Sequence, residues 1–66
     1  MNRKEHHRRA LRAFDALRDY REDDIETAIV DFLADLRHLC DRDGLDLARC
    51  DRMAHQHYLA ELADDT

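Results

Sequence analysis

The feature that most constrains this chain is the absence of proline and the presence of a single glycine, Gly44, among 66 residues. Proline and glycine supply most of the tight turns in proteins, and a β-sheet needs several such turns. Charged residues make up 41% of the sequence, which is typical of well-solvated helices around a thin apolar core. The sequence therefore predicts one all-α domain over residues 1–66.

Apolar residues recur with helical spacing in three segments, and the middle segment has an apolar arc wide enough for two neighbours. Gly44 is expected to cap the middle helix in the left-handed conformation, and Asp46 is expected to cap the start of the next helix. Asp23 and Glu26 have the spacing of a capping box before the middle helix. The sequence thus predicts short helices over residues 3–20, 24–42 and 47–63.

The short connection around Gly44 predicts that the second and third helices form an antiparallel hairpin. In such a hairpin, residues whose numbers sum to about 90 lie level with each other, so apolar residues meet apolar residues along both helices. Leu36 and Ala54 are one such pair.

A domain of this size buries only about 60% of the surface that its unfolded chain exposes, and small folds often gain stability by association. Val30, Leu33 and Leu59 are among the apolar residues in excess of what three short helices can cover. One interpretation is that the first helix covers Val30 and Leu33. The favoured interpretation is a dimer patch made of Val30, Leu33 and Leu59, through which a two-fold homodimer completes a helical bundle.

A column of polar residues runs beside the apolar face of the second helix, and the hairpin would bring His57 and Glu61 toward it. Carboxylates and imidazoles on facing helices are how helical bundles hold divalent metals. The Glu-x-x-His signature of di-iron bundles is absent, and a hydrogen-bonded seam at the edge of the core explains the same column. The candidate ligands of a divalent metal are Asp31, Asp35, His38, His57 and Glu61.

Cys40 and Cys50 lie level in the predicted hairpin and allow three interpretations. A disulfide requires their Cα atoms to approach within about 7 Å, which is tight for packed helices. A zinc site that adds His55 and His57 has no standard ligand spacing. The expected state, in a reducing cytosol, is two buried thiols that act as small apolar residues.

Charge is distributed unevenly. Residues 1–21 contain seven Lys or Arg and three acids, a net charge of +4, whereas residues 22–66 contain four Arg and thirteen acids, a net charge of −9. Helix-surface ion pairs such as Glu5 with Arg8 account for the basic segment. Because no glycine is interleaved with the basic residues and the rest of the chain is acidic, we do not expect nucleic-acid binding.

No run of apolar residues approaches the roughly 18 that a membrane span needs, and no apolar stretch follows the basic N-terminus as it does in a signal peptide. The expected location is therefore the cytoplasm. The sequence contains no phosphate-binding loop, nucleophile elbow or recognised Cys–His pairing. We therefore identify no catalytic residue and do not expect an enzyme.

Four aspartates are clustered around the predicted turn between the second and third helices. Acidic fields steer basic partners, although a solubilising role explains the same charges. The sequence predicts an interaction protein that binds a basic protein partner through Asp41, Asp43, Asp46 and Asp51.

The segment over residues 28–62 contains an ordered set of residues, namely Asp31, Leu33, Asp35, Leu36, His38, Cys40, Asp41, Gly44, Asp46, His57, Tyr58 and Glu61. In this set the segment resembles a family of short uncharacterised helical proteins from bacterial plasmids, phages and other mobile elements. The resemblance covers about half of the chain and leaves the first predicted helix unmatched. It implies a bacterial cytoplasmic accessory protein with a regulatory role, such as an anti-defence factor that binds a host protein, and it supplies no catalytic residue.

Overall fold

The computed structural model describes residues 2–21 and 24–63. These ranges contain helices and short connections but no strand, which confirms the all-α class. The third helix has the predicted bounds, and the second is displaced by one residue. The elements are α1 (Arg3–Ala16), the 3₁₀ helix η1 (Arg18–Tyr20), α2 (Ile25–Asp43) and α3 (Leu47–Ala63).

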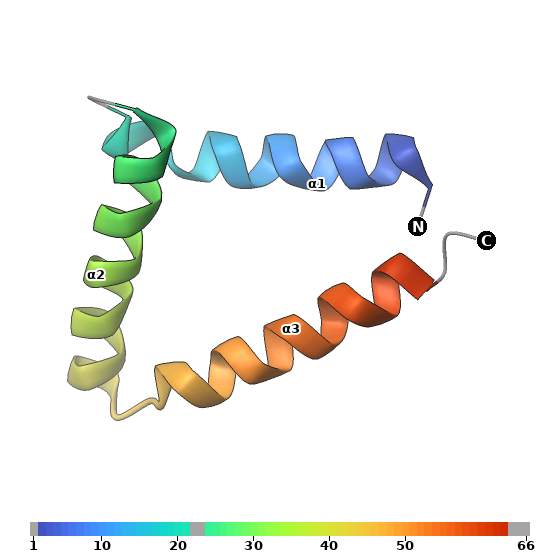
Figure 1. The fold of residues 1–66 in the computed structure, drawn as a ribbon. Coiled ribbons are helices and arrows are strands. Elements are labelled where there is room, and N and C mark those ends of the chain that lie inside the picture. Colours follow the sequence, from blue (N-terminus) through green and yellow to red (C-terminus); the bar gives the residue numbers. More distant parts are fainter. Residues whose placement is uncertain (1, 22–23, 64–66) are drawn as a thin grey trace.

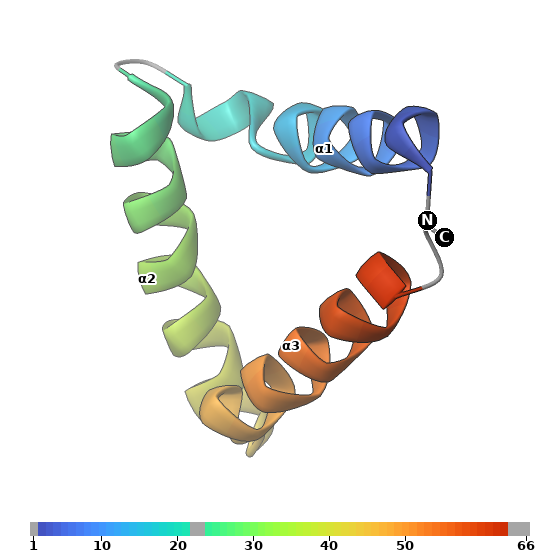
Figure 2. The ribbon, with the colours of Figure 1, turned by 45° about the vertical axis from the view of Figure 1, so that its right-hand side comes forward.

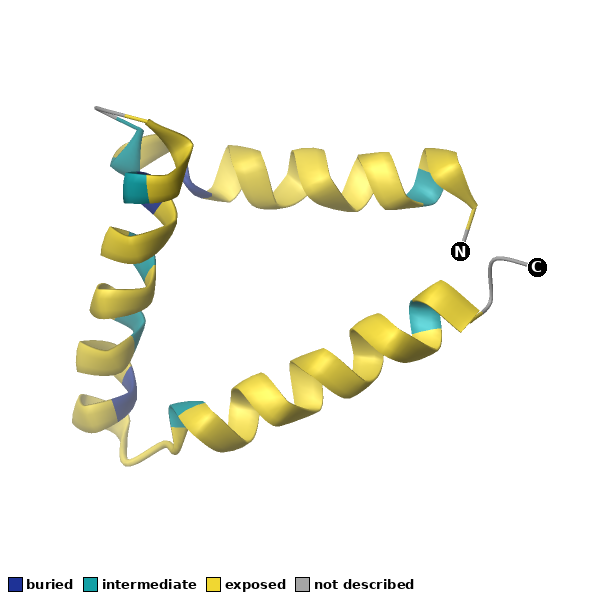
Figure 3. Cartoon of the chain, in the orientation of Figure 1, coloured by how far each residue is buried: buried dark blue, intermediate teal, exposed yellow. Residues whose placement is uncertain are grey.

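The helix predicted over residues 3–20 is interrupted at Leu17. The Leu17 N–H donates to the carbonyls of Ala13 and Phe14, at 3.1 and 3.2 Å, and a bond shared in this way marks the change from α-helical to 3₁₀ geometry. Leu17 is 7% exposed, and Ala28 in the first turn of α2 is fully buried. Figure 3 shows buried residues at the corner where α1 ends and α2 begins. The interruption therefore turns the chain so that α2 begins against this corner.

Capping groups fix both ends of α2 and the start of α3. The Asp24 side chain accepts the Thr27 N–H at 2.7 Å, so Asp24 is the N-cap of α2. Asp23, which belongs to the expected capping box, lies outside the described residues. Gly44 follows α2 with φ 68° and ψ 31°, the left-handed conformation that glycine adopts without steric cost. Asp46 accepts a backbone N–H from the first turn of α3 at 3.3 Å, as predicted.

α1 and α3 leave opposite ends of α2 and extend to the same side of it, so the backbone outlines an open frame (Figure 1 and Figure 2). The turn of the predicted hairpin is present, but α3 diverges from α2 beyond it. The space between the two helices is lined by Leu33 and Leu36 from α2 and by residues that include Ala48 and Ala54 from α3. The predicted pair of Leu36 and Ala54 thus lines a hollow of about 470 Å³ rather than a filled core.

The described part of the chain has a very small core. Its buried residues are Leu17, Ala28 and Cys40, and most of the helical surface is exposed (Figure 3). The radius of gyration is 13.8 Å, whereas a compact domain of this length has a radius of gyration of about 11 Å. The three helices therefore leave much of their apolar faces exposed to solvent instead of enclosing them.

Candidate interaction surfaces

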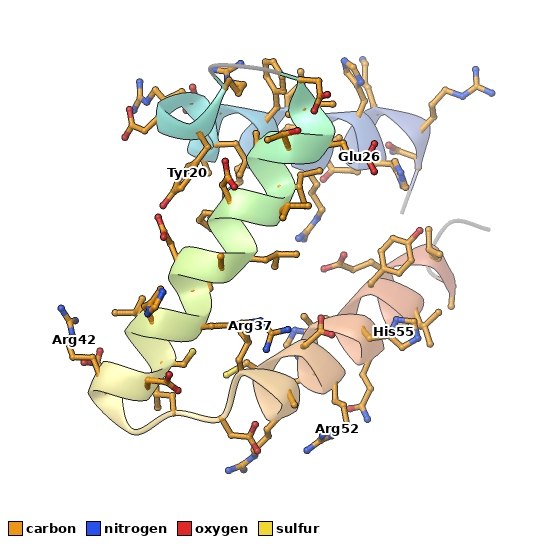
Figure 4. All side chains as sticks on the ribbon, turned by 60° about the vertical axis from the view of Figure 1, so that its left-hand side comes forward. Tyr20, Glu26, Arg37, Arg42, Arg52 and His55 are labelled. Atoms are coloured by element: carbon orange, nitrogen blue, oxygen red, sulfur yellow. The ribbon has the colours of Figure 1, made fainter. Side chains whose placement is uncertain are left out.

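A hydrogen bond between η1 and α2 holds the corner of the frame. The Tyr20 hydroxyl donates to Asp35 Oδ2 at 2.8 Å, and the Tyr20 and Phe32 rings meet edge to face with centroids 5.4 Å apart. The hydrogen bond to Asp35 is the main cause that raises the pKa of the Tyr20 hydroxyl, and burial adds to it. Figure 4 shows Tyr20 reaching from η1 toward α2. Beside this corner, the Arg21 guanidinium lies 3.9 Å from the centroid of the Phe14 ring, a cation–π contact.

The candidate metal ligands do not form a cluster. In the described ranges, no group of three His, Cys, Asp or Glu side chains is placed to hold a metal ion. Asp31 and His38 are exposed on α2, His57 is exposed on α3, and Asp35 accepts the bond from Tyr20. The divergence of α3 from α2 is the physical reason, because the candidate site needs the two helices to run side by side.

Glu61, the remaining candidate ligand, links α3 to α1. Its carboxylate lies 3.0 Å from a guanidinium nitrogen of Arg9, and both side chains are partly exposed. An exposed ion pair contributes about 1 kcal/mol or less, so it holds the open side of the frame weakly. The ion pair expected between Glu5 and Arg8 on α1 is also present. A hollow of about 220 Å³ beside the Arg9–Glu61 pair is lined by His6, Ala10, Tyr58 and Leu62.

Sequence reasoning missed both of these contacts between elements. Tyr20 lies beyond the interruption at Leu17, so the periodicity of the first helix gives no indication of where its ring points. Arg9 and Glu61 are far apart in the chain, and no local spacing rule connects them. The signal in the sequence that bears on the Arg9–Glu61 contact is the net positive charge of residues 1–21 and the net negative charge of residues 22–66.

The four aspartates predicted to form an interaction surface are all exposed around the turn between α2 and α3. Asp43 accepts a hydrogen bond from the Arg42 guanidinium at 2.8 Å, and Asp46 caps α3, so two of the four have local roles. Burial raises the pKa of the Cys40 thiol, and negative neighbours that include three of these aspartates raise it further. Three arginines, Arg42, Arg49 and Arg52, lie among these aspartates, so the segment over residues 41–52 has a net charge of −1.

Both cysteines are free thiols. Cys40 is buried, as predicted, whereas Cys50 is exposed at the edge of the hollow between α2 and α3. The prediction of two buried thiols is correct for Cys40 alone, because α3 turns away before its apolar face is covered.

Many large apolar side chains are exposed on the surface. Within the described ranges, twelve large apolar residues are between 39% and 59% exposed, and they occur on all three α-helices and in the turn. The predicted dimer patch is part of this set, and Leu33 of that patch also lines the hollow between α2 and α3. The set consists of Leu11, Phe14, Ile25, Ile29, Val30, Leu33, Leu39, Leu45, Met53, Tyr58, Leu59 and Leu62.

The hollow between α2 and α3 is lined mainly by apolar atoms, with two charged residues among its lining. Arg37 comes from α2 and Asp51 from the first turns of α3. Figure 4 shows Arg37 pointing from α2 toward α3, whereas Arg42 points away from the frame. The lining of the hollow is thus mainly apolar, with one positively charged and one negatively charged side chain.

In the part of the chain that the structure describes, no helix is both long enough and apolar enough to cross a membrane. Comparison of the chain with protein-family models, with curated proteins and with solved structures finds no match in any of the three.

Proposed function

We propose that the chain is a helical protein-interaction module that binds other helices through its exposed apolar faces. The observation that supports the proposal is the contrast between twelve half-exposed large apolar side chains and three buried residues in the described ranges. Single exposed apolar residues are normal on proteins, whereas apolar residues that follow one another along one helix face form a contiguous stripe of the kind that marks an interaction site. Amphipathic helices bind through such faces, with anchors at helical spacing.

One stripe on α2 shows how much such docking contributes. Ile25, Ile29 and Leu33 follow one another at intervals of four residues, so they lie along one face, and each is between 43% and 45% exposed. Full burial of such a side chain contributes about 1.5–3 kcal/mol, so burial of the remaining exposed part contributes on the order of 1 kcal/mol. A partner helix that covers the stripe therefore gains about 3 kcal/mol from these three residues.

The exposed aspartates around the turn give the module a preference among partners. Asp41, Asp43, Asp46 and Asp51 are exposed around the turn, and Asp51 lines the apolar hollow between α2 and α3. Pairing of these carboxylates with Lys or Arg on a partner favours basic partners over acidic ones. The proposed partner is therefore a protein with an apolar helix face and basic flanks.

The resemblance over residues 28–62 supports an extension of this proposal. In that setting the module is a regulatory protein of a bacterial mobile element, and its basic partner is a host protein. Anti-defence is one such role, and binding alone is sufficient for it.

Affinity capture with matched baits tests the proposal. The wild-type chain and the variants Leu33→Glu and His38→Glu are immobilised and exposed to the same cell lysate, and the retained proteins are identified by mass spectrometry. Leu33 lies in the apolar stripe, whereas His38 is exposed on the opposite side of α2, so the two variants add a negative charge to different faces. We expect a basic protein that wild type and His38→Glu retain and Leu33→Glu loses. Identical retention by all three baits, or retention of nothing, would contradict the proposal.

A further inference from the structure

We propose that the apolar faces are covered by a second copy of this chain, with α1 of each copy seated on the hollow between α2 and α3 of the other. This inference rests on the proposed function, because it names the occupant of the same apolar surface. It requires that one chain supplies both the helix that docks, α1, and the hollow between α2 and α3 that receives it.

The accessible surface of the chain fits an occupant of this size. The chain exposes 5946 Å², whereas a compact monomer of 7.9 kDa exposes about 4,400 Å². The excess is about 1,500 Å² for each chain. Obligate homodimers bury roughly 2,000–5,000 Å² in total, or about 1,000–2,500 Å² for each copy. Two copies that cover each other's excess surface therefore reach the area of an obligate dimer.

α1 and α2 carry opposite charges that are not paired along their lengths within one chain. α1 has five basic and two acidic residues, a net charge of +3, and α2 has five acidic and two basic residues, a net charge of −3. The two helices meet through η1 and then separate (Figure 1). In a two-fold pair, α1 of each copy lies near the acidic α2 of the other, so both net attractions act at once, although the α2 residues that line the hollow itself are Leu33, Leu36 and Arg37. A foreign partner would have to supply a basic and an acidic helix together.

α1 also carries an apolar ridge that matches the apolar hollow. Leu11 and Phe14 are three residues apart on α1, and both are about half exposed. The receiving hollow of about 470 Å³ includes Leu33 and Leu36 in its lining. Seating the ridge there covers half-exposed apolar side chains on both copies.

The hollow offers one carboxylate to the basic residues of the ridge. Asp51 and Arg37 are the charged residues of the lining, and Arg8 and Arg12 are three residues before and one residue after Leu11 on α1, so the ridge would enter with its arginines toward Asp51 and away from Arg37. The Arg8 side chain is 74% exposed even though it contacts Glu5, so it is accessible to a second copy. An ion pair at this position would direct α1 into the hollow in one register.

The mass of the purified chain in solution tests whether a second copy binds. Light scattering after size exclusion, at concentrations from low to high micromolar, is expected to give twice the chain mass of 7.9 kDa. Leu11→Glu and Leu33→Glu place a charge in the ridge and in the hollow, and both are expected to give the monomer mass, whereas His38→Glu, on the opposite side of α2, is expected to remain dimeric.

A monomer at every concentration would overturn the inference, and so would a dimer that persists in both leucine variants. The purified chain contains no other protein, so either result leaves the proposed function to the affinity-capture experiment. The two proposals can therefore fail separately.

A mixture of two charge-reversed chains tests whether α1 docks on the hollow. No apolar residue is changed, so loss of folding is not mistaken for loss of binding. One chain carries Arg8→Glu and Arg12→Glu, and the other carries Asp51→Lys. In each homodimer, like charges meet wherever α1 of one copy docks on the hollow of the other. In the heterodimer, one of the two docking sites has the native pair of charges, and the other has both charges reversed, so opposite charges meet at both sites. Native mass spectrometry is expected to show more heterodimer than random pairing of the two chains gives. A random distribution would overturn the assignment of α1 to the hollow.

Discussion

Gly44 gives a stability prediction whose magnitude depends on the backbone alone. It joins α2 to α3 with φ +68°, and a Cβ added there meets no atom within 4 Å. A side chain at this position therefore causes no clash, and what remains is the cost of a left-handed backbone in an L residue, about 1–2 kcal/mol. Alanine also restricts the unfolded chain, which offsets about 0.4–1 kcal/mol of that cost. We expect Gly44→Ala to lower the free energy of unfolding by about 1 kcal/mol.

Two matched variants separate the backbone from other effects. Asparagine tolerates the left-handed region better than alanine, so Gly44→Asn is expected to lose less stability than Gly44→Ala. D-Alanine, which chemical synthesis can place in so short a chain, has the hand that favours positive φ and fills the same open space. It is expected to raise the free energy of unfolding by about 0.4–1 kcal/mol.

Urea unfolding followed by circular dichroism measures these differences. All chains are compared at one protein concentration, because the stability of an associating chain depends on concentration. A loss above about 3 kcal/mol for Gly44→Ala would mean that atoms crowd the Cβ position, since the backbone cost alone cannot reach that value. Equal stability of the glycine, L-alanine and D-alanine chains would mean that residue 44 is not left-handed. Either result would refute the reasoning.

Three further predictions concern titratable groups. The hydrogen bond to Asp35 raises the pKa of the Tyr20 hydroxyl, so ultraviolet titration is expected to show one tyrosine that ionises above the ordinary value of 10.0. Asp35→Asn is expected to lower the midpoint of that titration. An unchanged midpoint would argue against the hydrogen bond. The pKa of Asp24 is lowered because its carboxylate accepts a backbone N–H. The stabilising contribution of Asp24 is present above the pKa of this group in the unfolded chain, near 3.8, and is lost as the pH falls through its pKa in the folded chain. The difference between the urea midpoints of wild type and Asp24→Ala should therefore become smaller in acid. A gap that is constant with pH would count against it. Cys40, which is buried and has a raised pKa, is expected to react with a thiol reagent at least about tenfold more slowly than exposed Cys50; equal rates would exclude its burial.

The ends of the helices could be predicted because each depends on a few neighbouring residues. Gly44 supplies a left-handed cap, Asp46 supplies an oxygen for the first turn of α3, and both act as the sequence indicates. The interruption at Leu17 could not be predicted in this way, because neither proline nor glycine marks it. It depends on the packing of the corner where Leu17 and Ala28 are buried.

The direction of α3 could not be predicted, and the metal hypothesis depended on it. Periodicity identifies which face of a helix is apolar, but the angle between two helices depends on the sizes of the side chains that meet. α3 diverges from α2 beyond the turn (Figure 1), and no spacing rule in the sequence sets that angle. Asp35 and His57, placed near each other by the hairpin alignment, consequently belong to different surroundings: Asp35 bonds to Tyr20, and His57 is exposed.

The small core has a consequence for how long each copy of the protein persists in a cell. With Leu17, Ala28 and Cys40 as the buried residues of the described ranges, a lone chain offers proteases access along most of its length. Weakly packed helices also open locally at little cost in free energy. The association proposed above would suppress such openings by mass action, so the lifetime of a copy would increase with the number of copies around it. Abundance would then act as a threshold: a few copies would be degraded as they appear, whereas a pool large enough for copies to meet would protect itself.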